Sequence, residues 1–371
     1  MFDIILGLFL FLSPIIIMMG NNARLNGTIL AMQFYQFKTL SFTNDILQLQ
    51  FFEYGIILLF IIALMQKSIR DFKDKWMALF LGLCALSVTF YPKTFLSFIP
   101  IFLGILFYYL VVCYAKNIKK LLYPILLVSA LNTFFAILQF FKIYWIYNPP
   151  TSDNYIIQGR YDGLMAISNH LGIYQALALP VCYAIHPLFS IIPLTGLLLS
   201  KSATGILAGA IGMVYLFYPK RKKLFINFAP MGLIALLGII ITFTLRNYRY
   251  GIYKMGIRLG IWIDTIKEII KRPAIGFGLG SFSNVLRWEW AYNEYLEIAF
   301  CVGVLGLFFI FMFLKDRFKN IGIGLERYIA SSCLIIVIIC LTQPALHFAR
   351  LTGTIIPLFA FLEILKRKEI L

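Results

Sequence analysis

The sequence predicts an all-α, polytopic integral membrane protein with about twelve transmembrane helices and a large extracytoplasmic loop. Two observations predict this class. Hydrophobic residues make up 61% of the chain and charged residues only 13%, which lies outside the range of soluble globular domains. Apolar runs that approach the ~20 residues needed to cross a bilayer recur along the chain, separated by short basic segments. The net charge of +17 is divided among these segments, so we expect no nucleic-acid partner.

The predicted spans follow the apolar runs in order and form a single transmembrane domain over residues 1–371. The first run has no basic segment before it and no small-residue cleavage site, so we expect it to be retained rather than cleaved as a signal peptide. The predicted spans are Phe2–Met19, Gln50–Met65, Trp76–Tyr91, Phe95–Ala115, Leu121–Phe141, Ile167–Ile185, Leu188–Leu199, Ala203–Tyr218, Phe225–Leu245, Ala291–Leu314, Tyr328–His347 and Leu351–Leu365.

The basic residues predict which side of the membrane each loop faces. Lys and Arg cluster after the second, fourth, eighth, tenth and twelfth spans, which places all of these clusters on the same side. Short loops rich in Lys and Arg are retained in the cytoplasm, so we expect both termini to be cytoplasmic. The clusters are Lys67 to Lys75, Lys116 to Lys120, Lys220 to Lys223, Lys315 to Arg327, and Lys366 to Lys368.

The loop Arg246–Trp290 is basic although this topology places it outside the cell membrane. Positive charge kept on that side suggests an anionic ligand there. From Leu259 to Ile270 the apolar residues follow the spacing of one helical face, and Pro273 ends the pattern. We expect an amphipathic helix that lies along the membrane surface or on the protein.

The six cysteines all lie inside predicted spans, where single thiols are packing residues. We therefore expect no disulfide and no metal cluster. The first outer loop has no acidic pair, which argues against a metal-dependent enzyme acting on lipid-linked sugar phosphates.

Three separated stretches resemble conserved parts of one family. The first is Arg160-Tyr161-Asp162-Gly163 followed by Ser168-Asn169-His170-Leu171-Gly172, and the second is Leu199-Ser200-Lys201-Ser202. The third runs from Arg258 and Trp262 through Arg272-Pro273 and Gly276-Phe277-Gly278-Leu279-Gly280 to Asn293-Glu294-Tyr295-Leu296 and Gly303-Val304-Leu305-Gly306. In these stretches the chain resembles the O-antigen ligase and O-antigen polymerase (Wzy-type) superfamily of bacterial membrane enzymes. The resemblance covers about the second half of the chain.

The resemblance implies a metal-independent glycosyltransferase without a cofactor, acting at the outer face of the bacterial cytoplasmic (inner) membrane in surface polysaccharide or lipopolysaccharide biosynthesis. The donor would be a glycan on a polyprenyl diphosphate such as undecaprenyl diphosphate. The acceptor would be a sugar hydroxyl, either on a lipopolysaccharide core for a ligase or on another lipid-linked repeat for a polymerase.

Basic residues are expected to hold the diphosphate that leaves. Arg258 and Arg160 are the first candidates, since the planar guanidinium pairs bidentately with phosphate oxygens, and Lys201 is the third. The family commonly has Arg near this third position. Alternatively, each of these side chains reaches toward lipid headgroups and has no catalytic role.

The catalytic base is less clear from the resemblance. The family's ligases have a His, their proposed base, immediately before the Asn matched by Asn293, and this chain has Tyr292 there. A phenol is a poor base at neutral pH, so the remaining candidates are Glu294, Glu289 and His170. Glu294 could instead be a carboxylate favoured by the N-terminal dipole of the following helix.

Other polar and aromatic residues near these motifs are candidates for substrate contacts, namely Asn169, Tyr292 and Asn293. The spacing Gly276-x-Gly278-x-Gly280 differs from a nucleotide-binding loop, so we interpret it as a turn that allows close backbone approach.

A second class of function fits the same composition. A transporter or flippase of lipid-linked oligosaccharide would show broken helices and charges at the middle of the bilayer. The charges of this chain gather instead in an outer loop, which favours the enzyme. An inactive relative is a third reading, because Tyr292 stands where the ligases have His.

Overall fold

The computed structural model describes residues 1–21, 40–41, 46–47, 51–68, 72–92, 95–143, 160–165, 168–217, 248–286, 288, 291–343, 345–347 and 349–368. Within these residues the chain is helical, apart from the short strands β1 (Leu40–Ser41) and β2 (Ile46–Leu47), which pair antiparallel. The predicted helical class is therefore confirmed for this part of the chain. The predicted span Phe225–Leu245 lies outside the described residues.

The helices correspond closely to the predicted apolar runs. In chain order they are α1 (Phe2–Asn21), α3 (Phe51–Leu64), α4 (Lys75–Phe90), α5 (Phe95–Tyr114), α6 (Ile118–Phe140), α8 (Ser168–Ile185), α9 (Ile191–Ser200), α10 (Ala203–Phe217), α12 (Tyr248–Lys271), α13 (Phe282–Leu286), α14 (Glu294–Phe318), α15 (Leu325–Ile339) and α16 (Ala349–Lys368). Two 3-10 helices, η2 (Pro187–Ser190) and η3 (Ala345–His347), precede α9 and α16.

Three of these helices contain stretches long and apolar enough to cross a membrane: residues Ser97–Tyr114 of α5, all of α6 and all of α14. Several shorter apolar helices accompany them in the described residues, among them α4 and α10. The exterior is also apolar in places. Along α3, for example, Leu58, Ile61 and Leu64 are 49%, 50% and 71% exposed. Contiguous exposed apolar faces of this kind are typical of surfaces that contact lipid.

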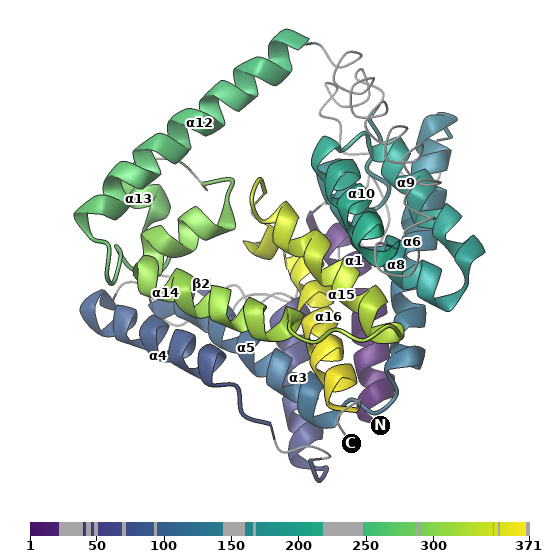
Figure 1. Ribbon diagram of the computed structural model, residues 1–371, viewed down its shortest axis with the longest axis horizontal. Coiled ribbons are helices and arrows are strands. Elements are labelled where there is room, and N and C mark those ends of the chain that lie inside the picture. The colour runs from purple at the N-terminus through teal and green to yellow at the C-terminus, as the bar shows by residue number, and fades with distance from the viewer. Residues whose placement is uncertain are drawn as a thin grey trace.

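The helices form two packed groups, joined along the centre of the molecule (Figure 1). On one side α8 packs against α6, α9, α10 and α15, and on the other α14 packs against α4 and α12. Helices α1, α15 and α16 lie between the two groups (Figure 1). Each group has its own hydrophobic core. The larger core includes Leu171 and Ile336, and the smaller one includes Phe80, Ile261 and Phe300.

Helix α12 begins at Tyr248, well before the expected start at Leu259, and ends at Lys271, close to Pro273. Ile261 and Thr265 are buried against the protein, whereas Leu259, Ile263, Ile266 and Ile270 are exposed. Most of the apolar stripe found from the sequence is therefore exposed, although Ile269 packs on the smaller core and Trp262 donates to the carbonyl oxygen of Ala291. Its exposure fits the alternative that α12 lies along a membrane surface.

Helix α14 was expected to be one continuous span, but it is interrupted at Gly303, whose φ of 84° and ψ of 173° are not helical. The loop after α12 fills the interruption. The backbone N–H groups of Phe277 and Gly278 donate to the carbonyl oxygens of Phe300 and Cys301, both at 2.9 Å. These bonds satisfy helical carbonyls that would otherwise lack a donor.

This close approach requires glycine on both sides. Gly276 also has a positive φ, of 67°, and a Cβ there would collide with the carbonyl oxygen of Phe300. A Cβ at Gly303 would collide with the carbonyl oxygen of Ala274. The interpretation of the glycine-rich segment as a turn for close backbone approach is confirmed.

Candidate functional site

Arg160 lies in a buried turn that leads into α8. The amide group of Gln139 on α6 holds this turn, since its oxygen accepts from the backbone N–H of Asp162 and of Gly163. Arg160 itself is 4% exposed. Its Nε donates to the carbonyl oxygen of Ser200 at 3.3 Å, and its Nη2 donates to Oδ1 of Asn169 at 2.5 Å. These bonds fix the guanidinium against the start of α8 and the end of α9.

The turn between α9 and α10 packs directly on the first turns of α8. A Cβ at Gly172 would collide with Ser202, so the small residues at these two positions permit the contact. Lys201 ends α9 in the left-handed conformation, with φ 48° and ψ 35°, and its side chain is exposed. His170 is 3% exposed on the first turn of α8.

Arg258 connects α12 to two other segments. Its Nη1 donates to the carbonyl oxygen of Thr342 at 3.2 Å, in the turn that follows α15. Its guanidinium carbon lies 4.8 Å from the centre of the Tyr292 ring, just before α14. Tyr292, like Lys201, has a positive φ, of 54°. Left-handed backbone at a non-glycine residue costs free energy, and such residues cluster at functional sites.

Glu294 is the first residue of α14 and is 3% exposed. Its Oε1 accepts from the backbone N–H of Leu346 at 2.6 Å, and its own N–H donates to the carbonyl oxygen of Cys340 at 2.9 Å. The helix cap is the preceding residue, Asn293, whose Oδ1 accepts from the N–H groups of Tyr295 and Leu296. Glu294 therefore holds the segment after α15 instead of capping α14, and the oxygen of Asn293 is engaged in the cap.

The predicted site residues form two groups, one around α8 and the α9–α10 turn and one around α12 and the start of α14. The turn after α15 links them. Oγ1 of Thr342 donates to Oγ1 of Thr204 on the first turn of α10 at 3.4 Å, while the carbonyl oxygen of Thr342 binds Arg258. All three stretches that carry the family resemblance thus reach one connected region. Glu289 lies outside the described residues.

Sequence reasoning missed the segment from Cys340 to Leu346, which it assigned to the end of a span. In the structure α15 ends at Ile339, and the next residues supply backbone groups to Arg258 and Glu294. A proline at position 344 was the available signal, because proline is unfavourable inside a helix.

The carboxyl group of Asp162, in the turn before α8, has a raised pKa. Burial raises the pKa of its carboxyl from the ordinary 3.8 to about 6, against the lowering effect of hydrogen bonds from Gln139 and from the backbone. Nε2 of Gln139 donates to Oδ1 of Asp162 at 2.7 Å. The carboxyl therefore changes charge closer to neutral pH than an ordinary aspartate does.

No three His, Cys, Asp or Glu side chains come close enough to hold a metal ion in the described part of the chain. The six cysteines are unpaired, five of them buried and Cys113 half-buried.

A cavity of about 560 Å³ lies elsewhere, against the start of α4 and the ends of α14 and α16, and none of the predicted site residues lines it.

No protein-family model matches this chain, and no curated protein matches it in sequence.

Proposed function

We propose that this protein is a polytopic membrane glycosyltransferase, with about twelve spans, that moves a glycan from a polyprenyl diphosphate to a sugar hydroxyl outside the bacterial cytoplasmic membrane. The observation that carries the proposal is the convergence of three separated stretches of sequence. Arg160, Lys201, Arg258 and Glu294 come from four different parts of the chain, yet contacts through Thr204 and Thr342 connect their surroundings.

The proposed reaction is a displacement at the anomeric carbon of the donor. The bond from this carbon to the diphosphate oxygen breaks, and a bond to the acceptor oxygen forms. Arg258, Arg160 and Lys201 stabilise the negative charge that develops on the diphosphate. Glu294 accepts the proton of the acceptor hydroxyl. Its contact with the segment after α15, which Arg258 also contacts, supports this role over that of His170.

Aromatic side chains beside these groups suit a sugar. Tyr292 contributes a half-buried ring against Arg258, and its left-handed backbone directs the chain sharply into α14. Tyr292 occupies the position at which the family's ligases have His, so in this proposal it contacts the substrate or positions Arg258 and leaves proton transfer to Glu294.

Deleting the gene and separating the surface glycans of the bacterium on a gel tests the proposal. A single repeat on its anchor indicates a polymerase, and accumulated lipid-linked long chains indicate a ligase. An unchanged glycan ladder contradicts both. Restoring the wild-type gene, but not an Arg258→Ala variant, should restore the original pattern.

A transporter or flippase of lipid-linked oligosaccharide is the second candidate, and the interruption of α14 at Gly303 favours it. Purified protein in liposomes distinguishes the two. An enzyme joins the donor glycan to the acceptor without moving the lipid between leaflets, whereas a flippase moves the lipid-linked glycan and leaves it unchanged.

A further inference from the structure

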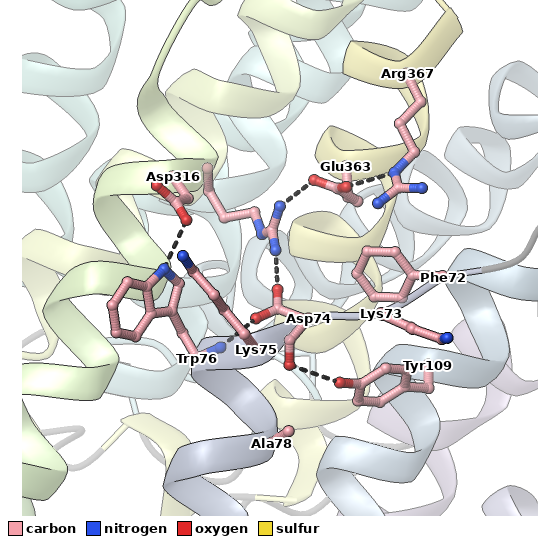
Figure 2. A pocket seen from close by; sticks show the side chains of 11 residues that line it. Phe72, Lys73, Asp74, Lys75, Trp76, Ala78, Tyr109, Asp316, Glu363 and Arg367 are labelled. Carbon is pink, nitrogen blue, oxygen red and sulfur yellow. Dashed lines mark hydrogen bonds and ion pairs between the residues drawn. The ribbon is translucent and has the colours of Figure 1, made fainter.

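A cavity lies where three segments distant in sequence meet beside Tyr109 of α5: residues 72–78 at the start of α4, the end of α14, and the end of α16 (Figure 2). They line the cavity of about 560 Å³. Each segment belongs to a different basic cluster that the sequence predicted to be cytoplasmic. The proposed transferase reaction gives this cavity no role, because none of the predicted site residues lines it.

The floor of the cavity contains two arginines paired with two carboxylates, together with a third carboxylate that accepts from a neutral donor. Arg317 is buried and forms ion pairs with both Asp74 and Glu363. Glu363 also accepts from Nε of Arg367 at 2.6 Å, and Oδ2 of Asp316 accepts from the indole Nε1 of Trp76 at 2.7 Å. Every carboxylate that lines the cavity therefore already has a donor (Figure 2).

The mouth, in contrast, carries the two exposed ammonium groups of Lys73 and Lys75. Lys73 and Lys75 lie on either side of Asp74 and are exposed (Figure 2). Neither ammonium pairs with a carboxylate in the described part of the chain. Nζ of Lys75 lies 4.7 Å from the centre of the Trp76 ring, so this aromatic face borders the cation.

We propose that this cavity binds a phosphate ester, held by Lys73 and Lys75 over the floor of Arg317 and Arg367. An anionic ligand is favoured over a cation because four cations and three carboxylates line the cavity, and donors already occupy the carboxylates. A phosphate monoester carries a charge of about −1.5 to −2 at neutral pH, and the excess of cations over carboxylates in the lining favours such an anion. Lysine also binds phosphate as a compact point charge.

A phosphate ester at this position has two possible sources, the headgroup of an anionic lipid or a soluble phosphate metabolite. Both present the same oxygens to Lys73 and Lys75. They differ in whether acyl chains accompany the phosphate, so binding measurements with and without acyl chains distinguish them.

Two measurements on the purified full-length protein test the proposal. The first is the affinity for glycerol 3-phosphate in a neutral detergent. The second is the affinity for phosphatidic acid over phosphatidylcholine, by native mass spectrometry or in nanodiscs. The test variant is Lys73→Ala/Lys75→Ala, which changes exposed residues only. The control is Lys119→Ala/Lys120→Ala, a pair of exposed lysines at the start of α6 that does not line the cavity.

We expect the test variant to weaken phosphate binding at least ~10-fold, and to remove most of the dependence of binding on salt, while the control stays near wild type. Loss of glycerol 3-phosphate binding identifies a soluble ligand, and loss of phosphatidic acid preference alone identifies a lipid headgroup. The proposal is wrong if wild type binds neither probe, or if the two double variants behave alike. Unchanged thermal unfolding of the test variant shows that any loss is not a folding defect. The result is independent of transferase activity.

Discussion

The guanidinium carbon of Arg258 lies 4.8 Å from the centre of the Tyr292 ring, and Nη1 of the same side chain donates to the carbonyl oxygen of Thr342. One arginine on a surface helix thus ties α12 to the start of α14 and to the turn after α15. The Tyr292 ring and the carbonyl oxygen hold the cation in place, and a planar guanidinium is the group expected to bind a phosphate.

Arg258→Ala should lower the turnover of lipid-linked donor at least ~10-fold, because a charged hydrogen bond contributes about 1.5–3 kcal/mol. Arg258→Lys should recover only part of the activity, since lysine keeps the charge but loses the planar fork. Turnover of purified donor by each variant measures both effects.

The matched control is Lys267→Ala on the same helix. Lys267 is exposed and pairs with Asp264, also exposed, at 3.2 Å, so the change should have little effect. If Arg258→Ala, Arg258→Lys and Lys267→Ala are equally active, Arg258 does not belong to the site.

Glu294→Gln should reduce the rate of transfer by ~10²-fold or more if Glu294 takes the acceptor proton. The amide oxygen of glutamine can still accept from the N–H of Leu346, so the segment after α15 should keep its position. Glu297→Gln is the control, because Glu297 is also buried, one turn further along α14, and accepts from the N–H of Ala291. Similar activity in the two variants would argue that Glu294 is a structural carboxylate.

Asp162→Asn should stabilise the protein at neutral pH but not in acid. Because burial raises the pKa of this carboxyl to about 6 in the folded state, the protonated form adds stability below pH ~4, and that contribution is lost as the pH rises through about 6. Asparagine stays neutral throughout and can still accept from Gln139.

The expected gain for Asp162→Asn at pH 7.5 is about 1–3 kcal/mol, and it should disappear near pH 4. Thermal unfolding of the detergent-solubilised protein at several pH values measures it. Asp264→Asn, at an exposed position on α12, is the control. A variant that is less stable than wild type at pH 7.5 would contradict the expected sign.

Arg317→Met should destabilise the protein by about 3–5 kcal/mol, because it leaves Asp74 and Glu363 buried without their shared cation. Neutralising all three positions, as Asp74→Asn/Arg317→Met/Glu363→Gln, should restore part of the stability, since the three buried charges are removed together and Arg367, which loses its bond to Glu363, is partly exposed. Thermal unfolding of both variants decides this. If the triple variant is less stable than Arg317→Met alone, the ion pairs are not the cause.

The sequence alone predicted most of the described helices and selected the candidate site residues. Apolar runs predicted α6 and α16 within a few residues of their observed ends, and Gly276 was correctly interpreted as a point of close backbone approach. These are local properties. Apolar periodicity and the conformational freedom of glycine are properties of one segment, so they can be detected from the sequence.

Only the tertiary structure shows that α14 is interrupted at Gly303 and that the carbonyl oxygen of Thr342 accepts from Arg258. It also shows which face of α12 packs on the protein. The carbonyl oxygens exposed at the break are tolerable because residues 277 and 278, distant in sequence, donate to them. Likewise, only the three-dimensional structure shows that Arg317 is buried and pairs with Asp74 and Glu363. Desolvation and hydrogen bonding depend on what surrounds a group in space, and neighbours in space are not neighbours along the chain.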